Sequence, residues 1–302
     1  MKSQIKIAIT GASGLLGQAM VRHFSTQGHL MWTIGRGMSS SPLAKGHMTW
    51  DPVRGVFESD PLKDMDVVIH LAGANVGQRW TAQHRQAIMG SRVHGTRLLM
   101  KTLEQQGFTG TVLCASAVGL FGNSDTLHKE RDAAGVGFLA DVVKAWEHEM
   151  GWDQARDFRV VALRLGVVLS PLGGSLQRMK PIYQCGLGAP LGTGMQWMSW
   201  IHIEDAVRAF DWCLHQPGIQ GPVHVVAPHP VQNRDFSKVL AHVLKRPHVA
   251  PRVPAWALRL LLGDMADVVL HSQRVSPSLL ENSGFSWKHP DLKEALMDCL
   301  SH

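Results

Sequence analysis

The segment "IAITGASGLLG" constrains the fold of this chain more than any other stretch of the sequence. Gly11, Gly14 and Gly17 separate an apolar run typical of a buried strand (5–10) from an amphipathic helical stretch (14–27). A turn without Cβ atoms lets the backbone approach a diphosphate, and the start of the following helix offers unpaired N–H groups to it. The spacing is G-x-x-G-x-x-G, and its place between a strand and a helix predicts a dinucleotide-binding crossover.

The next expected strand, 30–35, is followed by Arg36. A site specific for NAD carries an acidic residue here, which binds the ribose hydroxyls, whereas a guanidinium suits a 2′-phosphate. The sequence therefore predicts NADP(H) as the cofactor, with Arg36 reading its extra phosphate. The glycine-loop residues expected to contact this cofactor are Gly11, Ala12, Ser13, Gly14, Leu15 and Gly17.

Strand-like and helix-like segments alternate through the first half of the chain. Further strands are expected over 47–50, 66–73, 110–116 and 158–169, and helices over 80–106 and 137–150. Continuous apolar runs such as "DVVIHLAG" are typical of strands covered on both faces. The fold class is therefore α/β, a doubly wound parallel sheet with helices on both sides.

The composition of the sequence changes after Ser170, where a Gly- and Pro-rich stretch predicts an irregular start to a smaller lobe over 171–302. Within this lobe, a helix over 204–216 and a strand over 223–226 are expected to return to the first domain. Helical segments dominate from residue 233 onward.

Composition narrows the class of protein further. Of 302 residues, 45% are hydrophobic and 18% charged, which excludes a disordered chain. The net charge of +6 is dispersed without a basic run, so we expect no nucleic-acid partner. The four cysteines are far apart, and their spacing predicts neither a disulfide framework nor a metal site. The absence of a long apolar run and of a signal sequence favours a cytoplasmic protein without a membrane span.

Several longer motifs carry a family resemblance, among them "HLAGANVGQRW", "SRVHGTRLL", "SAVGLFG", "LRLGVVLSPLGG" and "GLGAPLGTGMQWMSWIHIEDAV". With them the chain resembles the extended short-chain dehydrogenase/reductase superfamily. Within it, the chain is similar to an atypical, sugar-nucleotide-epimerase-like branch with its own C-terminal domain. The resemblance covers nearly the whole chain. It implies an NADP-binding Rossmann domain over 1–170 and a smaller mixed α/β substrate lobe over 171–302.

The resemblance also carries cofactor roles to particular residues. The turn after the fourth strand would pass the adenosine ribose, and backbone after the sixth strand would flank the nicotinamide. In "SRVHGTRLL", an arginine replaces the asparagine of the superfamily and would suit an extra cofactor phosphate. The residues concerned are Leu71, Ala72, Gly73, Arg92, Gly166, Val167 and Val168.

The catalytic set departs from the superfamily pattern. Active members use a serine or threonine after the fifth strand and a tyrosine that exchanges the proton. A lysine four residues later lowers the tyrosine pKa and holds the nicotinamide ribose of the cofactor. Ser116 matches the first role and Lys144 the third, but Ala140 occupies the tyrosine position. A methyl group exchanges no proton, so any reaction needs other acid–base chemistry.

Four residues are alternative proton donors. Tyr183 is the only tyrosine, Asp141 adjoins the vacant position, Lys144 itself titrates if desolvated, and His202 follows a strand in the lobe. The favoured function is an NADP(H)-dependent oxidoreductase or epimerase-like enzyme acting on an unidentified small or nucleotide-linked substrate, as a monomer or homodimer. The alternative is a catalytically reduced NADP(H)-binding sensor or regulatory module.

Overall fold

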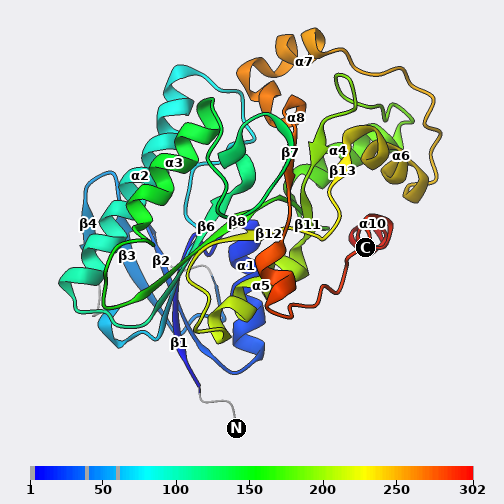
Figure 1. The fold of residues 1–302 in the computed structure, drawn as a ribbon. Helices are drawn as coiled ribbons and strands as arrows, with labels where there is room; N and C mark the ends of the chain where they lie inside the picture. The colour runs from blue at the N-terminus through cyan, green and yellow to red at the C-terminus, as the bar shows by residue number, and fades with distance from the viewer. Residues whose placement is uncertain (1–3, 38–40, 59–61, 302) are drawn as a thin grey trace.

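The structure is a computed structural model that describes residues 4–37, 41–58 and 62–301 (Figure 1). An eight-stranded sheet forms the centre of the larger domain, and all neighbouring strands in it are parallel except the last pair, β3 and β4. The expected doubly wound α/β fold is confirmed. In spatial order the strands are β12 (Gly221–Val225), β8 (Arg159–Leu165), β6 (Thr111–Ala117), β5 (Val67–His70), β1 (Lys6–Thr10), β2 (Leu30–Gly35), β3 (Gly46–Asp51) and β4 (Val56–Glu58).

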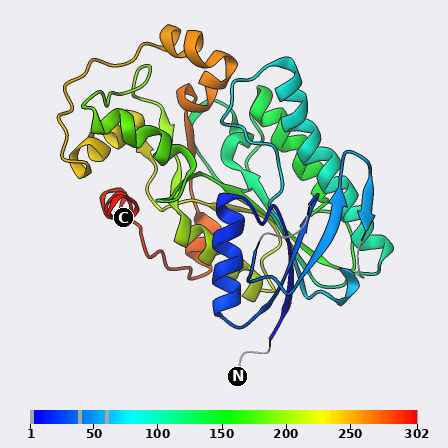
Figure 2. The ribbon, with the colours of Figure 1, turned by 180° about the vertical axis from the view of Figure 1, so that it is seen from behind.

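Helices cover both faces of this sheet. Helices α2 (Ala82–Gln105) and α3 (Phe138–Met150) pack together on one face, whereas α1 (Leu15–Thr26) and α5 (Ile203–His215) pack together on the other (Figures 1 and 2). The central strands β1, β5 and β6 are almost wholly buried and apolar between these layers, as their sequences indicate. The order of the strands places β1 beside β5, so the glycine loop that follows β1 lies next to the turn that follows β5.

The prediction of one strand over 158–169 is wrong in one respect, because the strand divides at Gly166. The first part is β8 in the large sheet, and the second is β9 (Val167–Leu169), which pairs with β11 (Trp200–His202). A Cβ atom on Gly166 would lie 2.5 Å from the carbonyl oxygen of Ser199, so only glycine fits where the chain changes sheets. The continuous apolar sequence concealed this break.

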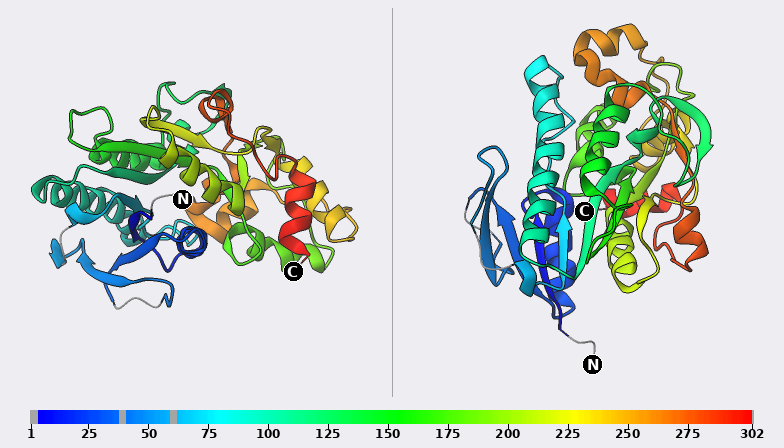
Figure 3. Two further views of the ribbon diagram at one scale, coloured as in Figure 1. Left: turned by 90° about the horizontal axis from the view of Figure 1, so that it is seen from below. Right: turned by 60° about the vertical axis from the view of Figure 1, so that its left-hand side comes forward.

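The smaller lobe contains a four-stranded sheet, ordered β13 (Val231–Gln232), β10 (Trp197–Met198), β14 (Gln273–Val275) and β7 (Ser124–His128). The stretch expected to be irregular contains a regular helix, α4 (Gly174–Gln184). Helix α10 lies at the end of the molecule away from β3 and β4 (Figure 3). The other helices are α6 (Asn233–Val243), α7 (Ala255–Leu262), α8 (Asp267–Leu270), α9 (Ser278–Asn282) and α10 (Leu292–Leu300), with short 3-10 turns η1 (Leu62–Asp64), η2 (Val118–Phe121) and η3 (Gly263–Ala266).

Two elements from the second half of the sequence belong to the large domain. Strand β12 pairs with β8 along its whole length and forms the edge of the eight-stranded sheet, and α5 covers β6 and β8. The chain therefore crosses between the two domains more than once. Among the described helices, none combines the length and apolar character needed to cross a bilayer.

Candidate cofactor site

The glycine loop is shaped so that only glycine fits at its key positions. Gly11 has φ +70°, and a Cβ atom there would lie 2.9 Å from the backbone nitrogen of Ala72. A Cβ atom on Gly17 would lie 2.2 Å from the carbonyl oxygen of Gly11. Helix α1 begins at Leu15 with no side-chain cap and no acidic residue in its first turn. Its first N–H groups and positive dipole end are therefore open to an anion.

A buried chain of polar side chains holds the loop against the end of β5. The Oγ1 atom of Thr10 accepts hydrogen bonds from the backbone N–H groups of Leu71 (3.1 Å) and Ala72 (3.2 Å). It lies 2.8 Å from Nδ1 of His70, whose Nε2 lies 3.0 Å from Oγ1 of Thr96. Both lone pairs of Thr10 Oγ1 accept hydrogen bonds from backbone N–H groups, so its own proton is donated to Nδ1 of His70. The proton of the neutral imidazole is therefore on Nε2.

A cavity of about 1140 Å³ opens beside this loop. The residues around it come from the glycine loop, from the end of β2, from the turn after β5 and from α2. Two guanidinium groups, those of Arg22 and Arg36, line it, and none of its described lining residues is acidic. Arg36 is exposed, and no hydrogen bond or ion pair joins its side chain to another described residue. Expected cofactor residues that line the cavity are Gly11, Ala12, Ser13, Arg36, Ala72 and Gly73.

Three further residues that line the cavity, Arg22, His47 and His94, were not predicted from the sequence. Arg22 lies four residues after Gln18 on α1, so both side chains occupy one face of the helix beside the glycine loop. That spacing was visible in the sequence. His47 and His94 come from β3 and α2, and only the folded chain brings these two elements to the cavity.

Arg92 braces the turn after β5. Its guanidinium donates to the carbonyl oxygens of Ala74 (3.0 Å) and Ile88 (3.2 Å), and it lies over the ring of Trp146. Burial lowers the pKa of Arg92 to about 10. A Cβ atom on Gly73 would lie 3.2 Å from this guanidinium, so the absence of a side chain at Gly73 makes room for it. The structure therefore shows Arg92 positioning the turn, and Arg92 is not among the cavity-lining residues.

Ser116 does not present a free hydroxyl. It is 2% exposed, and its Oγ donates a 2.5 Å hydrogen bond to the Glu147 carboxylate. Glu147 in turn receives two hydrogen bonds from Arg164, of 2.8 and 2.7 Å, in a buried ion pair. Because neighbouring residues of a strand point to opposite faces, Ala117 points to the face opposite that of Ser116 at this end of β6. The hydroxyl expected to bind a substrate oxygen is thus part of a structural network.

Lys144 forms an ion pair on the surface of α3. Its ammonium pairs with Asp141 at 2.7 Å, and both side chains are about half exposed on the surface of α3. Ala140 is fully buried. The side chain of α3 that packs with Ala117 and its neighbours is Val143, in an apolar cluster. The face of α3 toward the end of β6 therefore carries an apolar group and no proton donor at Val143.

The remaining expected residues fall into four places. Leu71 packs against the main core, Leu15 lies where a Cβ atom on Gly173 or Gly174 would meet it, and Gly14 immediately precedes helix α1. Gly166, Val167 and Val168 lie at the break between β8 and β9, where the N–H of Val167 donates to the carbonyl oxygen of Ser199.

Tyr183, the alternative acid, lies in a second apolar core in the lobe. Its hydroxyl is 2.6 Å from Oγ of Ser237, and burial raises its pKa above the ordinary value. A buried phenol with a raised pKa and an occupied hydroxyl is poorly suited to proton exchange with a substrate.

Sequence comparisons agree with this geometry. The profile of the NAD dependent epimerase/dehydratase family matches residues 7–227. The chain belongs to this family. The resemblance read from the sequence motifs is thereby confirmed. Residues 253–299 match a further profile, described as a domain of unknown function (DUF1731).

Relatives within the epimerase family match this chain from end to end. Epimerase family protein Mb2239 of Mycobacterium bovis is 40% identical over 96% of both chains, and epimerase family protein YfhF of Bacillus subtilis is 34% identical over 98% of both. The crystal structure of human epimerase family protein SDR39U1 (isoform 2) with NADPH superimposes with a TM-score of 0.88. It is 25% identical and covers 99% of this chain and 100% of its own.

Proposed function

We propose that this epimerase-family protein binds NADP(H). The diphosphate would lie on the glycine loop and the start of α1, and the 2′-phosphate beside Arg36 and Arg22. The observation that carries the proposal is a cavity with two arginines and no acidic side chain among its described lining residues. An acidic residue that binds a free ribose 2′-hydroxyl would repel a phosphate, whereas a guanidinium forms paired, charge-assisted hydrogen bonds with it. The similar human protein was crystallised with NADPH.

The residues present fit such a cofactor. The space that a Cβ atom would fill at Gly11 and Gly17 is already occupied by neighbouring backbone, so the loop stays bare and its N–H groups accessible. The Thr10–His70–Thr96 chain fixes the turn at Leu71 and Ala72 beside it. When bound, the nicotinamide supplies a site that accepts or donates hydride.

We propose further that the protein holds NADP(H) as a sensor or regulatory module and does not use a serine–tyrosine–lysine relay. Ser116 is bound to Glu147, Lys144 is paired with Asp141 at the surface, and Val143 supplies an apolar contact at the end of β6. General acid–base catalysis requires a titratable group within hydrogen-bond reach of the reacting atom. Ser116 and Val143 supply none, and the titratable ammonium of Lys144 is paired with Asp141.

A second candidate is an NADP(H)-dependent oxidoreductase or epimerase-like enzyme acting on a small or nucleotide-linked molecule. Two polar contacts between the lobe and the large domain favour this candidate. Arg178 of α4 donates to the carbonyl oxygen of Gly77, and Arg85 of α2 pairs with Asp264 at 2.9 Å. A lobe held next to the cofactor domain is the arrangement by which this class of enzyme encloses a substrate.

Equilibrium binding tests the cofactor proposal. We expect Arg36→Asp to weaken NADPH binding at least tenfold and to change NADH binding little, because only the former carries the 2′-phosphate. Arg246→Asp introduces the same charge change at an exposed arginine of the lobe and serves as the control. Equal losses for both coenzymes in the Arg36 variant would show that this arginine does not read the phosphate.

Turnover separates the two candidate roles. NADPH oxidation and NADP+ reduction would be followed with a panel of carbonyl compounds and nucleotide sugars, in single-turnover conditions at high protein concentration. Tight NADPH binding without turnover supports the sensor role. Hydride transfer to any panel member that survives in Ser116→Ala and Lys144→Ala would instead establish an enzyme with a different proton donor.

A further inference from the structure

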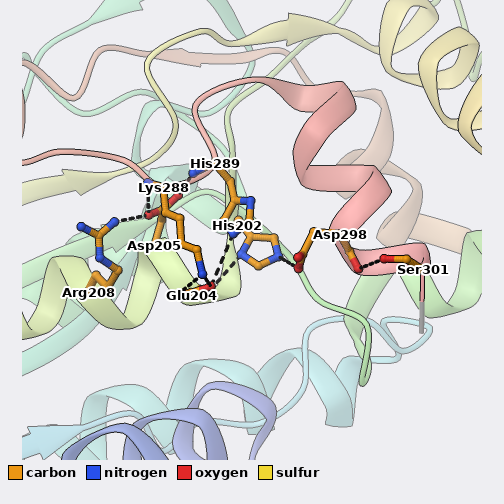
Figure 4. A network of polar contacts seen from close by, with 8 residues as sticks. All are labelled: His202, Glu204, Asp205, Arg208, Lys288, His289, Asp298 and Ser301. Atoms are coloured by element: carbon orange, nitrogen blue, oxygen red, sulfur yellow. Dashed lines mark hydrogen bonds and ion pairs between the residues drawn. The ribbon is translucent and has the colours of Figure 1, made fainter. Parts of the chain in front are cut away.

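A cluster of imidazole and carboxylate groups lies where the C-terminal segment meets helix α5 (Figure 4). His202 ends β11, Glu204 stands in the first turn of α5, and His289 precedes α10. Asp298 approaches from α10 itself. The two histidines are buried, whereas the side chains of Glu204 and Asp298 are nearly half exposed, so the cluster is open to solvent on one side.

Two of the separations between donor atoms are close to those between the ligands of a tetrahedral metal ion. One donor atom each from His202, Glu204 and His289 lie within 4.8 Å of one another. Nε2 of His289 is 3.4 Å from Oε2 of Glu204, and Nε2 of His202 is 3.2 Å from Oδ2 of Asp298. Ligands bound tetrahedrally at the usual zinc distances are about 3.3 Å apart.

His202 supplies an independent sign of a missing partner. Its Nδ1 accepts a hydrogen bond from the backbone N–H of Glu204, whereas its Nε2 is buried without a hydrogen-bond partner in the described structure. The Asp298 oxygen at 3.2 Å does not meet hydrogen-bond geometry. A buried polar atom left unpaired costs about 1 to 3 kcal/mol, and a metal ion between these atoms would satisfy it.

A buried carboxylate next to the cluster fixes the backbone that carries its ligands. Asp205 is fully buried, and its two carboxylate oxygens accept the backbone N–H groups of Lys288 and His289, each at 2.7 Å. Arg208 neutralises it at 2.8 Å. The backbone that carries His289 is therefore fixed relative to the helix that carries Glu204, which is how outer contacts orient metal ligands.

Lys288 lies on the acidic side of the cluster. Its ammonium lies 2.8 and 2.9 Å from the two oxygens of Glu204, and 56% of its side chain is exposed. An exposed lysine can swing into solvent when a divalent cation replaces it. Binding through Nε2 of His202 also moves the ring proton to Nδ1 and gives up the hydrogen bond from Glu204, at a cost of about 1 kcal/mol.

We propose that His202, Glu204 and His289, with Asp298 as the fourth ligand, form a site for a divalent transition-metal ion of the zinc class. Two imidazoles and two carboxylates are a ligand set that zinc accepts in tetrahedral geometry. With four protein ligands the site is closed, so its role is structural. It fastens the segment that carries His289 and α10 to the start of α5, and none of its ligands lines the cofactor cavity. Cysteine spacing could not reveal it, because its ligands come from distant parts of the chain.

The test uses the full chain without a histidine tag, freed of metal with a chelator. We expect one equivalent of Co2+ to produce the visible absorption of tetrahedral cobalt, and Zn2+ to displace it and raise the melting temperature. His289→Ala and Glu204→Gln should each weaken Zn2+ binding more than tenfold. His215→Ala, which removes a histidine paired with Asp211 elsewhere on α5, should leave it unchanged.

Lys288→Ala gives a result that an accidental surface site would not. Because the competing ammonium is gone, Zn2+ should bind several-fold more tightly. Circular dichroism and NADPH binding show whether each variant remains folded. Absence of the cobalt absorption in the wild type, or Zn2+ affinity that is equal in wild type, His289→Ala and Glu204→Gln, would overturn the proposal.

Discussion

His70 should make the protein lose stability in mild acid. It is fully buried, and burial, with a smaller contribution from the nearby charge of Arg92, lowers its pKa from 6.5 to about 4. Between these two values the unfolded chain binds a proton that the folded chain does not. The free energy of unfolding therefore falls as the pH falls from 6.5 toward 4, and the contribution of His70 is intact above 6.5.

The size of this effect follows from the difference in pKa. Each unit corresponds to about 1.4 kcal/mol, so His70 alone should remove about 2 kcal/mol between pH 7 and pH 5. The structure also shows what protonation disrupts. A proton on Nδ1 points at Thr10 Oγ1, which already accepts the N–H groups of Leu71 and Ala72 and would then have no acceptor for its own proton.

Urea unfolding at several pH values, followed by tryptophan fluorescence, measures this contribution. His70→Asn keeps a hydrogen-bonding side chain but does not titrate, so its stability should fall by about 2 kcal/mol less than that of the wild type between pH 7 and 5. His148→Asn, at an exposed histidine, is the control and should follow the wild type. Parallel pH profiles for wild type and His70→Asn would refute the reasoning, whatever their absolute stabilities.

Two further predictions concern the glycine loop and the buried ion pair. Gly17→Ala places a methyl group 2.2 Å from the carbonyl oxygen of Gly11, so we expect a loss of about 1 to 3 kcal/mol in thermal unfolding and weaker NADPH binding. Arg164→Met leaves the buried Glu147 carboxylate without its cation and should cost about 3 to 5 kcal/mol, whereas Ser116→Ala removes one hydrogen bond and should cost about 1 kcal/mol. Similar losses in these last two variants would contradict the assignment of Ser116 to the edge of the network.

The strands and helices of the large domain and the cofactor loop were accessible from sequence because each depends on local patterns. Strand and helix periodicities are read within one segment, and the glycine triplet needs only its flanking strand and helix. The break in the strand at Gly166 was harder to predict. It depends on the carbonyl of Ser199, which only the folded chain brings against this glycine.

The catalytic positions were less predictable, because motif matching does not fix the side to which a side chain points. A shift of one residue on a strand reverses the face, and a shift of one on a helix turns it by about 100°. Ser116 points into the buried network and Lys144 points to solvent, although both match the motif by spacing. The cluster around His202 and His289 joins segments whose proximity no local pattern encodes.

The edge position of β12 has a consequence for any shortened form of the protein. A chain ended near residue 170 would still contain every strand of the large sheet except this one, and the helix α5 that covers β8 would be missing as well. Strand β8 would then present its unpaired backbone and apolar side chains to solvent, a template for association with other chains. The nucleotide-binding half of this molecule is therefore not an autonomous module, and its solubility depends on sequence that lies beyond its nominal boundary.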